Sequence, residues 1–285
     1  MSKRALFVHA HPDDETINNG ATMAQMVEDG VAVTLVTCTR GEEGEVLVPE
    51  LAHLASSAED KLGIHRITEL ANAMKELGVK DHRFLGEYRD SGMMGTPQNE
   101  HPNCFWRADV ELAAKELAAI IDEVKPQVMV TYDENGGYGH PDHIQTHRVA
   151  MRAAEIATWQ ISKIYWNIMP KSVVQKGMDA MKEQGSDFFG AENVDDLPFV
   201  KDDSFVSAVI HAPNQVDKKM AAMKAHATQI SLDGPFFALS NNLGVQVFGD
   251  EYYTLVKGVK AAVVDRKSTR LNSSHSQQSR MPSSA

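Results

Sequence analysis

The chain has 285 residues, of which 42% are hydrophobic and 24% are charged, a composition typical of a soluble globular protein. No apolar run is long enough for a transmembrane helix, and the apolar stretch near the N-terminus is too short for a signal-peptide core. A formal charge of −11 without a basic cluster argues against a nucleic-acid partner, and two cysteines are too few for a disulfide framework. We therefore predict a cytoplasmic protein with no membrane or nucleic-acid partner. No feature of the sequence sets its oligomeric state.

The segment 265–285 differs in composition from the rest of the chain. It is rich in serine, arginine and glutamine and has few apolar residues, as disordered segments do. Its stretches 265–275 and 279–285 also resemble the in-frame translation of a common sequencing adapter. We therefore predict one domain over 1–264, followed by a disordered, non-native tail, and expect the natural C-terminus to be missing.

Strand-like and helix-like segments alternate along the body of the chain, the pattern of a parallel sheet with helices on both faces. The predicted strands are 5–10, 31–38, 82–85, 128–132, 163–168 and 205–210. The predicted helices are 19–29, 55–77, 110–124, 141–158 and 214–227, and Gly78 is placed to cap the second. Residues 87–103 have the composition of a loop, and the pattern is less regular after Lys171. The sequence thus predicts a Rossmann-like α/β fold, with ligands bound at the carboxyl ends of its strands.

The sequence HAHPDDE, which begins at His9, follows the first predicted strand. His11 and Asp14 are three residues apart across a turn and could share a metal ion. Asp13 lies beside them and is free to act as a general base. His9 is more simply explained as a structural residue, and Glu15 as an acid favoured by the dipole of the helix that follows.

A second cluster, DENGGYGHPDH, follows the fourth predicted strand and ends at His143. A catalytic zinc site has three protein ligands and an open position, so His143 could complete a site with the first cluster. His147 is four residues further along the same predicted helix and is an alternative partner. Tyr138 and His140 could stabilise an oxyanion or protonate a leaving amine, and Asp142 is expected to orient a neighbouring ligand.

The motifs AHPDDE and GHPDH resemble the two signatures of the LmbE-like, or N-acetylglucosaminyl-phosphatidylinositol deacetylase-like, superfamily. Further stretches are similar to the branch of it that acts in mycothiol biosynthesis, among them GEEGEV at 41–46, RDSGM at 89–93, YDENGGYGH at 132–140, AHATQ at 225–229 and ALSNN at 238–242. The resemblance extends over about residues 5–258 and implies that 1–264 is a catalytic domain.

This resemblance implies a hydrolase with one zinc ion, held by His11, Asp14 and His143. Asp13 would be the general base, His140 the general acid and Tyr138 a donor to the oxyanion. Fe²⁺ is a second possible metal, because it also accepts histidine and carboxylate ligands.

The resemblance also implies a small glycoside substrate, N-acetyl-glucosaminyl-inositol, cleaved to acetate and the free amine. Arg66, Asp90 and Glu45 would contact it, with Arg66 toward the inositol. Alternative substrates are mycothiol S-conjugates, although the amidases for these typically have Gly-Tyr-Pro-His where this chain has Gly-Tyr-Gly-His, or another N-acetylglucosaminide. The loop before Arg89 is shorter than in the family, which leaves sugar recognition open. A non-catalytic sugar binder is disfavoured, because it would not need Asp13.

Overall fold

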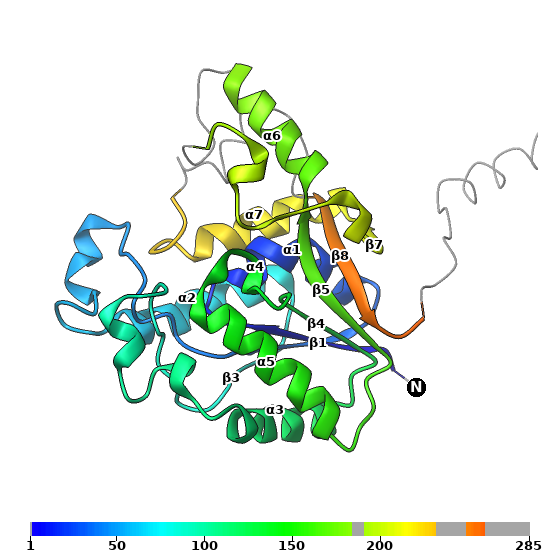
Figure 1. The fold of residues 1–285 in the computed structure, drawn as a ribbon, viewed down its shortest axis with the longest axis horizontal. Helices are drawn as coiled ribbons and strands as arrows, with labels where there is room; N and C mark the ends of the chain where they lie inside the picture. Colours follow the sequence, from blue (N-terminus) through cyan, green and yellow to red (C-terminus); the bar gives the residue numbers. More distant parts are fainter. Residues whose placement is uncertain (1, 184–190, 232–248, 260–285) are drawn as a thin grey trace, which may run out of the picture.

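The structure is a computed structural model that describes residues 2–183, 191–231 and 249–259. The predicted tail at 265–285 and the motif at 238–242 lie outside the described residues. Helices pack around one central sheet, whose strands follow the order β3-β2-β1-β4-β5-β8-β7, with β6 paired to β5 (Figure 1). The chain therefore has a mixed α/β fold.

The described strands are β1 (Arg4–His9), β2 (Ala32–Thr37), β3 (Asp81–Phe84), β4 (Val128–Thr131), β5 (Lys163–Pro170), β6 (Val200–Lys201), β7 (Ala208–His211) and β8 (Asp250–Lys257). The α-helices are α1 (Asp14–Glu28), α2 (Leu62–Leu77), α3 (Val110–Val124), α4 (Gly136–Gly139), α5 (Pro141–Ile156), α6 (Lys171–Glu183) and α7 (Val216–Ala225). Short 3₁₀ turns lie at Pro49–Leu54, Pro97–Glu100, Phe105–Arg107, Val194–Asp196, Asp203–Phe205 and Pro213–Gln215. None of the helices described here is long and apolar enough to cross a membrane.

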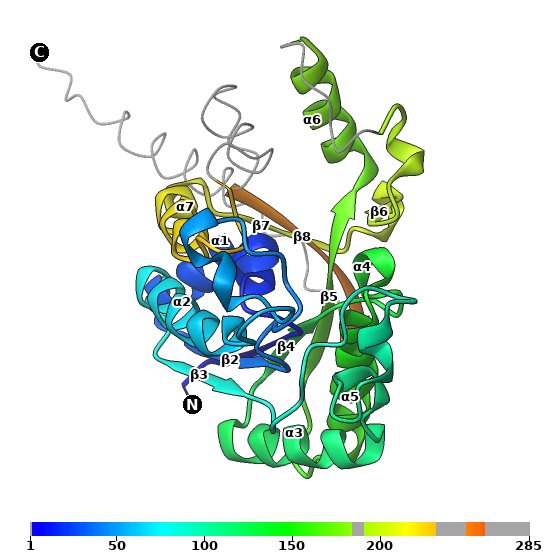
Figure 2. The same cartoon turned by 90° about the vertical axis from the view of Figure 1, so that its left-hand side faces the viewer.

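Strand β1 is the centre of the parallel part of the sheet and is buried on both faces. It pairs in parallel with β2 and β4, while β8 runs antiparallel between β5 and β7. Its residues Ala5 and Phe7 pack toward α1, α2 and α7, and Leu6 and Val8 pack toward α3 and α5. These two helix layers lie on opposite sides of the sheet (Figure 2). Burial on both faces explains why β1 is continuously apolar rather than alternating.

The predicted elements up to residue 170 are confirmed to within a few residues, with two exceptions. Helix α1 begins at Asp14, earlier than predicted, because its first turn faces the sheet mouth and carries polar side chains in place of apolar ones. The prediction of a helix from residue 55 is wrong for its first turns, since Asp60 has a φ of 53° and the helix begins at Leu62. Gly78 caps that helix with a φ of 77°, as predicted.

Three elements after residue 170 were not predicted: α6, the two-residue strand β6, and β8. Helix α6 packs on a small apolar cluster of its own and stands away from the main sheet (Figure 2). Strand β8 has Glu251 and Tyr253 on its buried face, where an apolar pattern would be expected. The Glu251 carboxylate is paired with the buried Lys219 ammonium at 2.7 Å, which compensates for burying its charge. Apolar periodicity does not predict a strand with a buried glutamate.

Candidate active site

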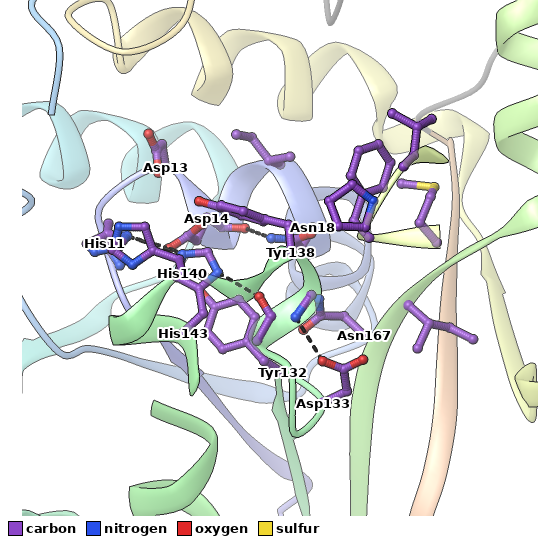
Figure 3. Close-up of a pocket in the computed structure, with 18 of the residues that line it drawn as sticks. His11, Asp13, Asp14, Asn18, Tyr132, Asp133, Tyr138, His140, His143 and Asn167 are labelled. Atoms are coloured by element: carbon purple, nitrogen blue, oxygen red, sulfur yellow. Dashed lines mark hydrogen bonds and ion pairs between the residues drawn. The ribbon is translucent and has the colours of Figure 1, made fainter. Parts of the chain in front are cut away.

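The two predicted clusters meet at the carboxyl ends of β1 and β4. These strands are direct neighbours, so the loops that follow them leave the sheet side by side. Both loops line one cavity of about 1160 Å³ (Figure 3). His11, Asp14, His140 and His143 lie at one end of it, and residues of β5 and α6 form the far wall.

Three ligand-type atoms form an almost equilateral triangle at the polar end. Asp14 Oδ2 lies 3.3 Å from His11 Nδ1 and 3.3 Å from His143 Nε2, and these two nitrogens are 3.3 Å apart. Ligands about 2.0–2.1 Å from a tetrahedral zinc ion are separated by about 3.3–3.4 Å. The spacing of the three atoms therefore fits one face of a tetrahedral metal site.

The hydrogen bonds on the other side of each imidazole leave the ligand nitrogens free. His11 Nε2 lies 3.2 Å from Asp142 Oδ2, and His143 Nδ1 lies 3.1 Å from the carbonyl oxygen of Gly136. An acceptor can be satisfied only by a ring N–H, so these contacts favour protons on Nε2 of His11 and on Nδ1 of His143. The two remaining lone pairs then face the Asp14 carboxylate, an arrangement that calls for a cation.

The charges around the triangle also favour a cation. Burial would raise the pKa of the Asp14 carboxyl, but the neighbouring imidazoles of His143 and His11 hold that pKa well below its usual range. Burial would lower the pKa of His11, yet Asp90, Asp14 and Asp142 raise it well above its ordinary value. Positive charge is therefore stabilised at this point of the cavity.

Other combinations of ligand-type side chains also come together among the described residues. Side-chain ligand atoms lie within 4.8 Å of one another in the groups His11, His140 and His143, and His11, Asp90 and Asp142. In these groups, His140 Nδ1 already accepts the backbone N–H of Asp142, and Asp142 contacts the far side of the His11 ring. His147 is not part of this cluster, since its Nδ1 lies 3.0 Å from the carbonyl oxygen of Tyr132.

Asp13 precedes α1 and has an unusual backbone conformation, with a φ of 120°. Its Oδ2 accepts a hydrogen bond of 3.1 Å from Arg66 Nη2. Burial raises the pKa of the Asp13 carboxyl to about 6, with Asp14 adding to the effect and Arg66 opposing it. A carboxylate with a pKa near neutrality, beside the triangle of His11, Asp14 and His143, has the properties of a general base.

Tyr138 and His140 lie on the second loop, next to the triangle. Tyr138 is 42% exposed, and its ring centroid lies 5.0 Å from that of His143. His140 is buried, and this burial, together with the charges of His11 and His143, lowers its pKa to about 3. Because its Nδ1 accepts a backbone N–H, the proton of the neutral ring is on Nε2. His140 is therefore a hydrogen-bond donor at neutral pH.

The three predicted substrate contacts line the cavity but differ in what they already bind. Arg66 is 2% exposed, and its guanidinium donates to the carbonyl oxygens of Pro12 and Gly41 as well as to Asp13. Asp90 is also buried and accepts the backbone N–H of Gly92 at 2.8 Å. The side chain of Glu45 is exposed at the rim. Of the three, Glu45 is the most accessible to a ligand.

Two supporting residues escaped prediction from the sequence. Ser91 donates its backbone N–H to Asp142 Oδ2 at 2.8 Å and so fixes the carboxylate that faces His11. Tyr132 stacks on His143, with ring centroids 4.4 Å apart, and its hydroxyl bonds His9 Nδ1 at 3.1 Å. The only signal for Ser91 was its place in the RDSGM motif, and the signal for Tyr132 was an aromatic residue at a strand end.

Residues 6–154, which include both clusters, match the family model described as PIG-L, GlcNAc-PI de-N-acetylase. The chain belongs to this family. It is 57% identical to the 1D-myo-inositol 2-acetamido-2-deoxy-alpha-D-glucopyranoside deacetylase of Geodermatophilus obscurus over 273 residues, covering 90% of this chain and 93% of that one. An enzyme of the same name from Catenulispora acidiphila is 56% identical, with 90% and 84% covered.

Two solved structures share the fold at low sequence identity. The N,N'-diacetylchitobiose deacetylase of Pyrococcus horikoshii matches with a TM-score of 0.57 and 18% identity, over 94% of this chain and 89% of that one. A 4-carboxy-2-hydroxymuconate hydratase from Pseudomonas putida matches with a TM-score of 0.61 and 20% identity, over 92% and 99%. Since a deacetylase and a hydratase share this fold, the reaction has to be argued from the site.

Proposed function

We propose that this PIG-L family member is a metal-dependent hydrolase that cleaves the acetamide of N-acetyl-glucosaminyl-inositol to acetate and the free amine. The observation that carries the proposal is the triangle of Asp14, His11 and His143 with the spare carboxylate of Asp13 beside it. The relatives that are 57% and 56% identical are named for deacetylation of this inositol glycoside, which supports the substrate. The parallel strand order β3-β2-β1-β4-β5 supports the predicted Rossmann-like description of the fold.

We assign the metal to the three atoms of the triangle, with zinc as the ion of choice and Fe²⁺ as the alternative. Two imidazoles and one carboxylate are a common set for a catalytic zinc ion, and the 3.3 Å spacings fit it. When bound, the ion would make a water molecule more acidic and polarise the amide carbonyl.

Asp13 is the proposed general base. It would accept a proton from the attacking water and return it to the amine nitrogen as the C–N bond breaks, so that acetate and a free amine result. A pKa of about 6 suits both steps, because the carboxyl is mostly ionised at neutral pH yet still holds a proton readily. Asp14 could not take this part while its oxygen is directed at the two histidines.

Tyr138 and His140 would stabilise the negative charge that develops on the amide oxygen. His140 donates from Nε2, and the Tyr138 hydroxyl adds a second donor from the exposed side of the cavity. The sequence pointed to His140 as the general acid, but its pKa of about 3 favours hydrogen-bond donation over proton transfer. Asp13 then remains the group that protonates the amine.

Glu45 at the cavity rim is the proposed contact to sugar hydroxyls. Asp90 and Arg66 would contribute from the wall. Both Asp90 oxygens already accept backbone N–H groups, from Gly92 and Glu43, and would share these bonds with a sugar hydroxyl, while Arg66 would act chiefly by holding Asp13. A polar glycoside suits this end of the cavity, where carboxylates and a guanidinium line the surface.

The proposal is tested by an assay of acetate release from N-acetyl-glucosaminyl-inositol. The protein is stripped of metal, checked by elemental analysis, and then supplied with Zn²⁺ or Fe²⁺; a mycothiol S-conjugate is assayed in parallel. We expect acetate release only after metal is restored, and faster turnover of the inositol glycoside. Full activity without metal, or hydrolysis of the conjugate alone, would contradict the proposal.

A further inference from the structure

The backbone of Asp13 requires an explanation of its own. Its φ of 120° and ψ of −35° lie in a region that residues with a side chain rarely adopt. Such a conformation persists only where surrounding contacts hold it. Asp13 and Asp14 point in different directions as a result, although they are adjacent in the chain (Figure 3).

Glu15 supplies a side-chain contact to the backbone N–H of Asp13. Its Oε2 accepts the N–H of Asp13 at 2.9 Å, and its Oε1 accepts Thr16 Oγ1 at 2.5 Å and His226 Nε2 at 2.9 Å. Glu15 and His226 are both 0% exposed. A first-turn acid that served only the helix dipole would gain as much on the surface, without the cost of burying a charge. The complete burial of the pair indicates a more specific role.

His226 reaches Glu15 from a distant part of the chain. It follows α7, and the next turn is fixed independently by α2: Glu69 accepts the backbone N–H of Thr228 at 2.8 Å and its hydroxyl at 2.7 Å. Gln229, in the same turn, lines the cavity and donates to the carbonyl oxygen of Glu45 at 3.0 Å. The end of α7 is thus anchored at one point to α2 and at another to the turn that carries Asp13.

We propose that Glu15 and His226 are positioning residues for Asp13: the buried pair holds the N–H of Asp13 and keeps its carboxylate directed into the cavity, away from the ligand position of Asp14. Neither residue is placed to touch substrate. The inference rests on the proposed function of Asp13 as general base. Loss of the pair should therefore slow turnover while leaving the metal and substrate binding in place.

The test compares Glu15→Gln, His226→Ala and His226→Gln in the full chain, with kcat, KM, metal content and melting temperature measured for each. We expect Glu15→Gln and His226→Ala to lower kcat by about 10- to 100-fold, with one metal ion still bound and KM changed by less than about threefold. His226→Gln retains an N–H that can donate to Glu15 and should restore a large part of kcat. If Glu15→Gln does not fold, the contrast between the two His226 variants decides the question.

Glu69→Gln is the matched control, because it weakens the other anchor of the same turn without contacting Asp13. It should lower the melting temperature but keep kcat. An equal loss of kcat in Glu69→Gln, full kcat in His226→Ala, or metal loss in parallel with activity would overturn the inference. Asp13→Ala, measured alongside, separates the two proposals. If it keeps full activity, the general-base assignment fails; if it is inactive while the Glu15 and His226 variants are normal, only the positioning role fails.

Discussion

The loops after β1 and β4 contribute to the same site but are built in different ways. The first is a tight turn whose polar atoms bind one another: the N–H of His11 donates to Asp14 Oδ2 at 2.9 Å, and the N–H of Asp13 donates to Glu15. The second contains three glycines with positive φ and leaves Tyr138 42% exposed. The first loop therefore fixes the proposed ligand and the proposed base by side-chain hydrogen bonds, whereas the second uses backbone freedom to bring the proposed donors alongside them.

Within the second loop, Gly136 packs directly against the proposed ligand His143. Its carbonyl accepts from His143 Nδ1, and a Cβ at this position would lie 2.5 Å from His143 Cβ. Gly137, the next residue, also has a positive φ, but a Cβ there would meet no atom within 4 Å. Gly136 is thus in close contact with the proposed ligand His143, whereas Gly137 only allows the chain to turn.

Removal of a ligand from either loop should have the largest effect. Asp14→Ala and His143→Ala should each lose bound metal and lower kcat/KM by about 10³-fold or more, because the ion supplies several kcal/mol of transition-state stabilisation. His147→Ala is the matched control on the same helix and should keep its metal, since His147 faces the Tyr132 carbonyl. Metal content and turnover are measured together. A metal-free His147→Ala protein would show that the ligand set is assigned wrongly.

Replacement of Asp13 should separate the base from the ligands within the first loop. Asp13→Ala should retain its metal and lower kcat by about 10²–10⁴-fold, the range for loss of a general base. The adjacent Asp14→Ala should lose the metal instead. If Asp13→Ala came out metal-free, or as active as the parent protein, the two carboxylates would have to exchange roles.

In the second loop, Gly136→Ala and Gly137→Ala form a matched pair. Both should lose about 1–2 kcal/mol of stability from the unfavourable φ. Gly136→Ala should in addition displace His143 and weaken metal binding by about 10-fold or more, whereas Gly137→Ala should bind metal normally. Metal titrations of the two proteins provide the comparison. Equal affinities would mean that the close contact of Gly136 is relieved without moving His143.

Tyr138→Phe should have a smaller effect, confined to turnover. It removes one hydroxyl donor from the exposed side of the cavity and leaves the ring against His143. We expect kcat to fall by about 10- to 100-fold, less than for a fully buried oxyanion donor, with metal content unchanged. An unaltered kcat would remove Tyr138 from the proposed mechanism and leave His140 as the donor.

The smallest effect is expected from ending the chain after Val264. The segment 265–285 has too few apolar residues to offset the entropy of ordering it, so neither loop should depend on it. Melting temperature and kcat should match those of the full chain within error. A truncated protein that unfolds or loses activity would show that this segment belongs to the folded domain.

Much of the parallel sheet and the choice of candidate ligands could be read from the sequence. Strands such as β1 and β4 are short apolar runs, and the clusters HAHPDDE and DENGGYGHPDH follow them directly. Local pattern and the rule of carboxyl-end sites therefore predicted that the two clusters meet, and the family resemblance favoured His143 over His147 as the partner of His11 and Asp14. The same reasoning failed for α6 and β8. Helix α6 packs on a separate apolar cluster, and the buried face of β8 carries Glu251, which pairs with Lys219.

Only the tertiary structure decided how the side chains around Asp13 are used. The guanidinium of Arg66, a proposed substrate contact that lines the cavity, is bound to Pro12, Gly41 and Asp13, and nothing in the sequence indicated these partners. Glu15 was expected to serve its own helix and is paired with His226, 211 positions away along the chain. Periodicity and turn chemistry record what a residue needs from its near neighbours. A hydrogen bond between distant segments produces no pattern in the local sequence. The bonds of this kind described here connect Asp13, the proposed general base, to Arg66 and, through Glu15, to His226.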